Sequence, residues 1–354
     1  HGRRLNDGGC KPCEVISNLS PRDSGLKARV SFLQPCLACR TMPCYIKRMN
    51  RDEQIREVKS ATLLRFNQVW QQNFQANRNA VERNPGVIAL KNKFRGLPCI
   101  VVGAGPSLDK NIRFLHRAQN KAVIISCDAA LKPLMGHGIV PDFVVCLDPQ
   151  EEISRFLVNV PHKGITLVVP SIVHPHVIKL WENDVLFFNK FAPDIPTLVE
   201  IQKIVPHIGI LTPGGTVLSV TYDLAFQAGG SPIIFVGQDL SYPKKKSHSH
   251  GSDAAGQGLK MMMEKHKDHL VLETDINGQS LRTLKSMSVS KQWFNWAFTT
   301  WKRENLLSVF NCSEAGILTD HCILEPLTEA IYKHCTQKLN VPWILKKALK
   351  RKIR

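Results

Sequence analysis

Short apolar runs dominate the middle of the chain, and most of them are bounded by Gly, Pro or Asp. They cover Cys99 to Val102, Ala122 to Ser126, Phe143 to Leu147, Ile165 to Val169, Val185 to Phe188, and Ile233 to Val236. Stretches with helical spacing separate several of these runs. Unbroken apolar strands that alternate with helices are typical of a parallel sheet covered on both faces. The pattern therefore predicts an α/β fold with a mostly parallel sheet and helices on both faces.

A longer period precedes these runs. From Asp52 to about Val81, apolar residues recur at near-helical spacing without Pro or Gly, which predicts one long amphipathic helix. Farther along the chain, residues 261–269 and 291–301 have helical patterns, and 271–275 is a candidate strand. We therefore expect a leader (1–48), an N-terminal helical segment (49–95), an α/β core (96–260) that carries the candidate binding motifs described below, a C-terminal part of the same domain (261–338) and a basic tail (339–354).

The leader shows no sustained helical or strand periodicity. We expect residues 1–48 to be disordered or mis-translated, with Met49 as the true start. A zinc site is the alternative, because Cys10-x2-Cys13 and Cys36-x2-Cys39 form paired knuckle spacings 22 residues apart.

The formal net charge of +18 is concentrated at the two ends of the chain, with +6 in residues 1–48 and +6 in residues 341–354. No zinc-finger pattern or RNA-binding aromatic signature accompanies it, so no nucleic-acid partner is expected. The basic tail has two readings, a weak peripheral membrane contact or a solvated charged end. Because the sequence contains no membrane-spanning apolar run and no secretory signal, we expect a cytoplasmic protein.

Two glycine turns are the main candidates for chemistry. The strand that ends at Val102 runs into Gly103-Ala-Gly105-Pro-Ser107, and a second turn, Thr212-Pro-Gly214-Gly215-Thr216, opens an apolar helix. Helix N-termini expose free amide groups and bind phosphate. A tight turn without a ligand is the alternative for the first turn, where Leu108 replaces the third glycine of the dinucleotide fingerprint.

Polar residues follow other strands at the same edge of the predicted sheet. Asp128 comes where an acid would reach a ribose hydroxyl, although it could instead cap the next helix. The strand ending at Val236 delivers Gly237 to Tyr242, and His248 and His250 lie in the loop beyond. A histidine beside a nucleotide crevice is a candidate general base.

A set of motifs, in the same order and spread over roughly residues 60–335, resembles one family. They are Gly103 to Asn111, Cys127 to Leu131, Pro141-Asp142, Leu147-Asp148, Gly214 to Val217, Gly237 to Tyr242, and Asn311 to Glu314. This is the domain shared by archaeal 6-hydroxymethylpterin diphosphokinases (MptE-like) and bacterial motility-associated factor (Maf) glycosyltransferases. The resemblance implies a Rossmann-like core similar to that of bacterial sialyltransferases, which bind a CMP-activated nine-carbon sugar.

The resemblance also implies roles for individual residues. The nucleotide would be held by Gly103, Gly105, Ser107, Gly214, Gly215 and Thr216. The donor sugar and the reacting centre would be lined by Asp128, Asp148, Asp239 and Tyr242, with Asp239 and Tyr242 as catalytic candidates. His248 is the expected base, because it lies where the family places its His.

The two branches of the family demand different chemistry. A diphosphokinase binds Mg-ATP, and Mg²⁺ prefers carboxylate ligands. The archaeal diphosphokinases of the family resemble enzymes that carry two Asp, one residue apart, at the end of the third strand. In this sequence Cys146 stands in the place of one of these acids, and only Asp148 remains. We therefore expect a glycosyltransferase that takes a CMP-activated, sialic-acid-like donor, needs no cofactor and acts on an unknown glycan or protein acceptor. A diphosphokinase that uses Mg²⁺ and ATP is the second hypothesis, and a non-catalytic nucleotide-binding protein is the third.

Overall fold

The computed structural model describes residues 51–181, 184–255, 259–301 and 308–349. The leader, with the two cysteine pairs at positions 10 and 13 and at positions 36 and 39, lies outside these residues. In the described chain, a parallel sheet of nine strands has the order β11-β10-β7-β1-β2-β3-β4-β5-β6. The strands are β1 (Cys99–Val102), β2 (Val123–Cys127), β3 (Phe143–Val145), β4 (Thr166–Pro170), β5 (Val185–Lys190), β6 (Ile210–Leu211), β7 (Ile233–Val236), β10 (Val309–Asn311) and β11 (Ile323–Leu324).

The chain reverses its direction across the sheet at β1. Successive strands from β1 to β6 extend to one side, and β7 then returns to the other side of β1. Cys99 consequently pairs with Val123 of β2 and with Ile233 of β7. In open α/β sheets, ligands bind beyond the carboxyl ends of the strands at such a switch point. The fold therefore directs attention to the loops that follow β1 and β7.

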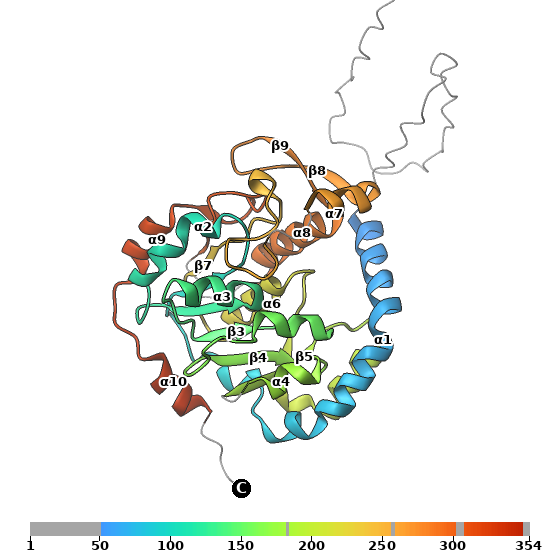
Figure 1. Ribbon diagram of the computed structural model, residues 1–354. Coiled ribbons are helices and arrows are strands. Elements are labelled where there is room, and N and C mark those ends of the chain that lie inside the picture. The colour runs from blue at the N-terminus through green and yellow to red at the C-terminus, as the bar shows by residue number, and fades with distance from the viewer. Residues whose placement is uncertain (1–50, 182–183, 256–258, 302–307, 350–354) are drawn as a thin grey trace, which may run out of the picture. The chain divides into compact units, whose positions relative to one another are not determined.

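Helices cover the sheet on both faces. They are α1 (Arg51–Arg83), α2 (Leu108–Asn111), α3 (Asp128–Gly136), α4 (Pro175–Lys179), α5 (Pro196–Ile204), α6 (Val217–Gln227), α7 (Leu259–Lys265), α8 (Lys285–Thr300), α9 (Leu327–His334) and α10 (Val341–Ala348). The long helix α1, blue in Figure 1, runs along one side of the sheet against α4 and α5. Helix α6 packs against β1 and β2, whose side chains are buried on both faces. No helix in the described ranges is both long and apolar enough to cross a membrane.

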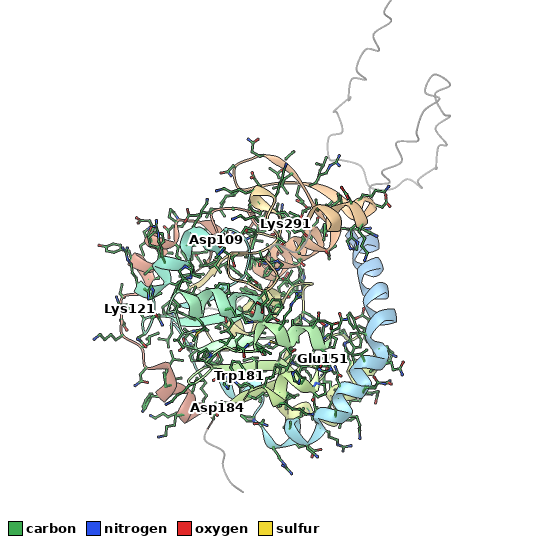
Figure 2. The ribbon with its side chains drawn as sticks, in the orientation of Figure 1. Asp109, Lys121, Glu151, Trp181, Asp184 and Lys291 are labelled. Atoms are coloured by element: carbon green, nitrogen blue, oxygen red, sulfur yellow. The ribbon has the colours of Figure 1, made fainter. Side chains whose placement is uncertain are left out.

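A small antiparallel hairpin lies outside the main sheet. It consists of β8 (Leu270–Thr274) and β9 (Ser280–Leu284), and α8 follows it directly. Lys291 of α8, labelled in Figure 2, forms an ion pair with Glu273 of β8 at 3.1 Å. Since both side chains are largely withdrawn from solvent, this pair fixes the hairpin to α8.

The predicted α/β class, the parallel sheet and the long first helix are all present. Six strands lie where apolar runs predict them, and the three that were not anticipated, β6, β10 and β11, have only two or three residues each. The helix expected after the first glycine turn is a single α-helical turn, α2, followed by 3-10 turns from Ile112 to Arg117. A one-turn helix offers a much weaker phosphate-binding terminus than the sequence suggests.

The basic tail is helical in its described part. Val341 and Leu345 of α10 are buried, whereas Trp343 is 53% exposed. The ammonium group of Lys347 lies 3.7 Å from the centre of the Trp343 ring. The membrane contact of this tail stays a prediction.

Candidate functional site

The first glycine turn is closed by a carboxylate. Asp239, which follows β7, accepts hydrogen bonds from the backbone amide of Ser107 at 2.9 Å and from its hydroxyl group. The amide of Gly103 donates to the Val236 carbonyl at 2.8 Å, and that of Gly105 donates to the Gly237 carbonyl at 2.9 Å. These three amides, which the sequence offers as phosphate donors, are therefore occupied by acceptors from the end of β7 and the loop after it.

Close packing explains the first glycine of this turn. A Cβ atom at Gly103 would lie 2.5 Å from the Gly237 carbonyl oxygen and 2.7 Å from a methyl carbon of Leu218. Both separations are far below van der Waals contact, so no larger residue fits here without a shift of the backbone. Since Leu218 belongs to the first turn of α6, the contact brings the two predicted glycine turns side by side.

The second glycine turn, in contrast, leaves donors free. Within the described chain, the backbone amides of Gly215, Thr216 and Val217 donate to no acceptor, and the buried hydroxyl oxygen of Thr216 has no partner. Gly215 has a positive φ of 94°. The ring of Trp293 occupies the space into which a Gly214 side chain would extend, with its nearest atom 2.2 Å from the ideal Cβ position. This turn is thus an open helix start that α8 holds in place.

Two carboxylates follow β2 and β3. Asp128 is buried at the start of α3, and its Oδ1 accepts a hydrogen bond from the Ala129 amide at 2.7 Å. Burial and, to a smaller extent, Asp148 raise the pKa of Asp128 to about 7, although the Ala129 amide lowers it in part. Asp148 is half-buried and accepts from the Gln150 amide at 2.9 Å. Asp128 and Asp148 therefore lie near enough to interact electrostatically, as the sequence predicts for one site.

The loop after β7 brings a histidine to the same region. The Ser249 amide donates to the Ala104 carbonyl at 2.8 Å, which ties this loop to the first glycine turn. His248 is half-buried, and burial, followed by the charge of Arg155, lowers its pKa. His250 is exposed, and its amide donates to Asp109 at 2.7 Å. Tyr242 begins the loop half-buried, and burial raises its pKa to about 12.

Buried polar atoms without partners gather around these loops. Native proteins pair nearly all such atoms, so a cluster of unpaired ones needs an explanation. Those that follow β2, β6 and β7 are Asp128 Oδ2, Thr216 Oγ1, Gln238 Nε2, His248 Nδ1 and Ser249 Oγ. These five atoms belong to loops that follow strands at the carboxyl edge of the sheet, the edge at which open α/β folds bind their ligands.

Helix α1 supplies residues that the sequence did not single out. Asn73 donates to the carbonyls of Pro149 and Ile172 at 2.8 and 3.0 Å, and Asn77 donates to those of Ser171 and Val173 at 3.2 and 2.7 Å. Both asparagines are buried. Their place in the apolar stripe of α1, four residues apart, is a signal that could have identified them. They hold the loops that follow β3 and β4.

Lys190 is a second residue that the sequence reading missed. It ends β5, and its ammonium lies 5.5 Å from the centre of the Trp70 ring. Burial lowers the pKa of Lys190 to about 8, and Asp148 partly offsets this effect. A charged residue two positions after the apolar run that ends at Phe188 was the available signal. Lys190 places a cation near Asp148.

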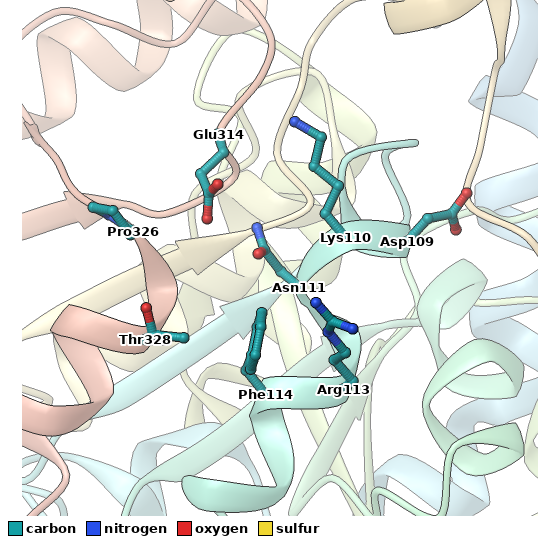
Figure 3. A pocket seen from close by; sticks show the side chains of 8 residues that line it. All are labelled: Asp109, Lys110, Asn111, Arg113, Phe114, Glu314, Pro326 and Thr328. Atoms are coloured by element: carbon teal, nitrogen blue, oxygen red, sulfur yellow. The ribbon is translucent and has the colours of Figure 1, made fainter.

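Two pockets open in this part of the fold. The smaller one, about 340 Å³, is lined by Asp148, Gln150, Glu152, Ile153, Arg155 and Phe156. The larger, about 550 Å³, lies between α2 and the loops around β11, and Figure 3 shows Phe114, Glu314 and Thr328 around it. In the described chain, the side chains with unpaired buried atoms line neither pocket. The smaller pocket contains Asp148, which interacts electrostatically with Asp128, and is therefore the better match to the candidate site.

Comparison with known proteins agrees with the motifs. Residues 72–245 match the family described as 6-hydroxymethylpterin diphosphokinase MptE-like. Two uncharacterised proteins of Treponema pallidum (strain Nichols) are similar to the chain. One is 26% identical over 202 residues, which cover 55% of this chain and 34% of the relative. The other is 34% identical over 86 residues, which cover 24% of this chain and 40% of the relative.

A solved structure shares the fold. The Maf glycosyltransferase of Magnetospirillum magneticum AMB-1 superposes with a TM-score of 0.52 at 24% identity, over 72% of this chain and 36% of that protein. The chain thus spans between about a third and two fifths of the lengths of these similar proteins.

Proposed function

Because residues 72–245 form a domain of the MptE-like family, we propose that the chain is a nucleotide-dependent transferase, and more narrowly a glycosyltransferase with a CMP-activated, sialic-acid-like donor. The observation that carries this proposal is the open start of α6 beside the end of β1. Free amides and the unpaired Thr216 hydroxyl can there surround one phosphate. A CMP-activated sugar contains a single phosphate, which a helix start can neutralise without a metal ion.

The chemistry is displacement at the anomeric carbon of the donor. The acceptor oxygen forms a bond to that carbon, the bond from the carbon to the phosphate oxygen breaks, and CMP leaves with the electron pair. His248 takes the acceptor proton, for which its lowered pKa is suited because the ring is neutral at pH 7. The amides at the start of α6 stabilise the charge on the departing phosphate.

The alternative, a diphosphokinase with Mg-ATP, requires oxygen ligands for a hard cation. Asp128 and Asp148 are the carboxylates at the candidate site. Cys146, two residues before Asp148, offers a buried thiol in the place of a further carboxylate. Burial raises the pKa of this thiol well above its usual value, so it stays protonated and is a poor ligand for Mg²⁺. A protonated thiol in the place of a second carboxylate supports the proposal of a CMP-activated donor.

Calorimetric titration with CMP and with ATP, each in EDTA and in Mg²⁺, tests the proposal. We expect CMP to bind with the same affinity in both buffers. Mg²⁺-dependent binding of ATP without any response to CMP would overturn the glycosyltransferase proposal and favour the diphosphokinase.

A substitution at the helix start sharpens this test. Thr216→Val removes a hydroxyl that has no partner in the described chain, so the folded protein should lose no stability, while CMP affinity should fall roughly tenfold. Thr221→Val is the matched control in the same helix, because its hydroxyl donates to the Val217 carbonyl at 3.0 Å. We expect that control to lower stability and to leave CMP affinity unchanged.

A further inference from the structure

Arg155 lies at the candidate site without a role in the motifs. It belongs to the 3-10 turns from Glu151 to Phe156 and lines the 340 Å³ pocket together with Asp148. Its guanidinium lies 4.8 Å from the centre of the Phe156 ring. In the described chain it forms no ion pair with any carboxylate. A guanidinium that lines a pocket without a carboxylate partner is a ready donor for an anion.

The charge of Arg155 reaches both halves of the site. It lowers the pKa of Asp128, which follows β2, and that of His248, which follows β7, although burial is the larger influence on each pKa. Arg155 therefore lies within electrostatic range of two residues that each keep an unpaired buried atom.

Lys132 links the backbone of Arg155 to the loop that carries His248. The ammonium of Lys132 in α3 donates to the Arg155 carbonyl at 2.7 Å and to the Asp253 carboxylate at 2.5 Å. Asp253 lies in the loop that carries His248. The backbone of Arg155, α3 and this loop are thus linked through a single side chain, so the guanidinium projects from a braced backbone.

Two acids, Asp148 and Glu152, line the pocket together with Arg155, and in the described chain neither forms an ion pair with it. Lys190 and Asp148 lie near enough to offset one another. Burial favours the protonated, uncharged form of Asp128. An anionic ligand beside these acids needs a cation, and Arg155 is the one that lines the pocket.

We propose that Arg155 binds the anionic group of the donor, a phosphate or a sugar carboxylate, in the pocket beside Asp148. This inference rests on the proposed function, because it presumes a nucleotide-activated donor. Bidentate hydrogen bonds from a guanidinium suit both anions, so the residue determines which donors are accepted.

Titration of Arg155→Gln and Arg155→Lys with CMP and with CMP-N-acetylneuraminate tests the inference. We expect Arg155→Gln to weaken donor binding at least tenfold, and Arg155→Lys to weaken it less because the charge remains. A loss with both probes identifies the phosphate, which they share, as the partner of Arg155, whereas a loss only with the activated sugar identifies the carboxylate.

Arg113→Gln is the matched control. Arg113 also precedes a phenylalanine in a 3-10 segment, and its guanidinium lies 4.8 Å from the Phe114 ring. It lines the larger pocket, so its substitution should leave both affinities unchanged. Thermal unfolding of each variant checks that the fold is intact.

The outcomes separate this inference from the proposed function. If the wild type binds both probes and Arg155→Gln binds them equally well, the role of Arg155 is overturned and the function stands. If the wild type binds only Mg-ATP, the CMP proposal fails, and the assignment of Arg155 survives only if Arg155→Gln weakens ATP. If the wild type binds none of the three nucleotides, both proposals fail.

Discussion

Asp239 accepts two hydrogen bonds from Ser107, one from the backbone amide and one from the hydroxyl, and both residues are buried. The pair joins the loops after β1 and β7 at the switch point of the sheet. A carboxylate here does what a bound phosphate would do, since it neutralises the donors of the glycine turn. The turn before α6 keeps the amides of Gly215, Thr216 and Val217 free in the described chain, which is why the phosphate is proposed there.

We expect Ser107→Ala to lower the free energy of unfolding by roughly 1–3 kcal/mol, because Asp239 loses a buried donor. CMP affinity should change less than about twofold. Denaturant unfolding and calorimetry measure the two quantities. A tenfold loss of CMP affinity at unchanged stability would instead place Ser107 among the nucleotide ligands, as the family resemblance implies.

Asn73 and Asn77 should contribute a large share of the free energy that holds α1 against the loops after β3 and β4. Asn73→Ala leaves two buried carbonyls, those of Pro149 and Ile172, without this donor, and a loss of about 2–3 kcal/mol of unfolding free energy is expected. Asn79→Ala, at an exposed position of the same helix, should change stability by less than about 0.5 kcal/mol. Equal stability of the two variants would show that α1 is held by its apolar contacts alone.

The fold was largely predictable because its strands are buried on both faces and carry unbroken apolar runs. Cys99–Val102 and Ile233–Val236 match observed strands to the residue. In contrast, β6 has two residues, Ile210 and Leu211, and β11 also has two; segments this short carry no period for a pattern to reveal. Their places in the sheet come from tertiary pairing.

The site was only partly predictable for a different reason. Motif residues such as Asp128 and Asp148 could be located because strand ends share one sheet edge. The sequence could not show which backbone amides remain free of acceptors. The Ser107 amide, for example, is occupied by Asp239, which lies 132 positions away along the chain. Arg155 and Lys190 gave no motif signal, and only the folded arrangement brings their charges near Asp148 or Asp128.

Asp142 has a structural role that should appear as a pH dependence. Its carboxylate accepts from the Ile124 amide at 2.8 Å, and burial raises its pKa from 3.8 to about 7, although backbone amides lower it in part. Between these values the folded chain binds more protons than the unfolded chain. The contribution of Asp142 to stability is therefore complete below pH 4 and is lost as the pH rises toward 7, by at most about 1.4 kcal/mol per pH unit.

Asp142→Asn keeps an acceptor for the Ile124 amide and removes this titration. From pH 4 to pH 7, the variant should thus gain stability relative to the wild type, as measured by denaturant unfolding at each pH. Asp184→Asn, at an exposed position labelled in Figure 2, is the control and should show no such gain. A constant difference between Asp142→Asn and the wild type over this range would mean that Asp142 titrates as it does in the unfolded chain.

His248 should set the rate of transfer without setting nucleotide affinity. Its ring is half-buried with Nδ1 unpaired in the described chain, and its lowered pKa keeps it neutral and able to accept a proton at pH 7. We expect His248→Gln to reduce CMP release from CMP-N-acetylneuraminate by roughly 10²- to 10⁴-fold, with CMP affinity nearly intact. The wild-type rate should rise with pH through a value below 6.5, and this limb should vanish in the variant.

His250→Gln is the matched control for this prediction, because His250 lies two residues away, is exposed and contacts Asp109 through its backbone amide alone. Its rate should stay within about twofold of the wild type, since no proton transfer depends on its side chain. Equal losses in the two variants would point to disturbance of the loop that the Ser249 amide attaches to Ala104. An unchanged rate in His248→Gln, with the acid limb still present, would remove His248 from the chemistry and leave Tyr242 or Asp239 as the next groups to substitute.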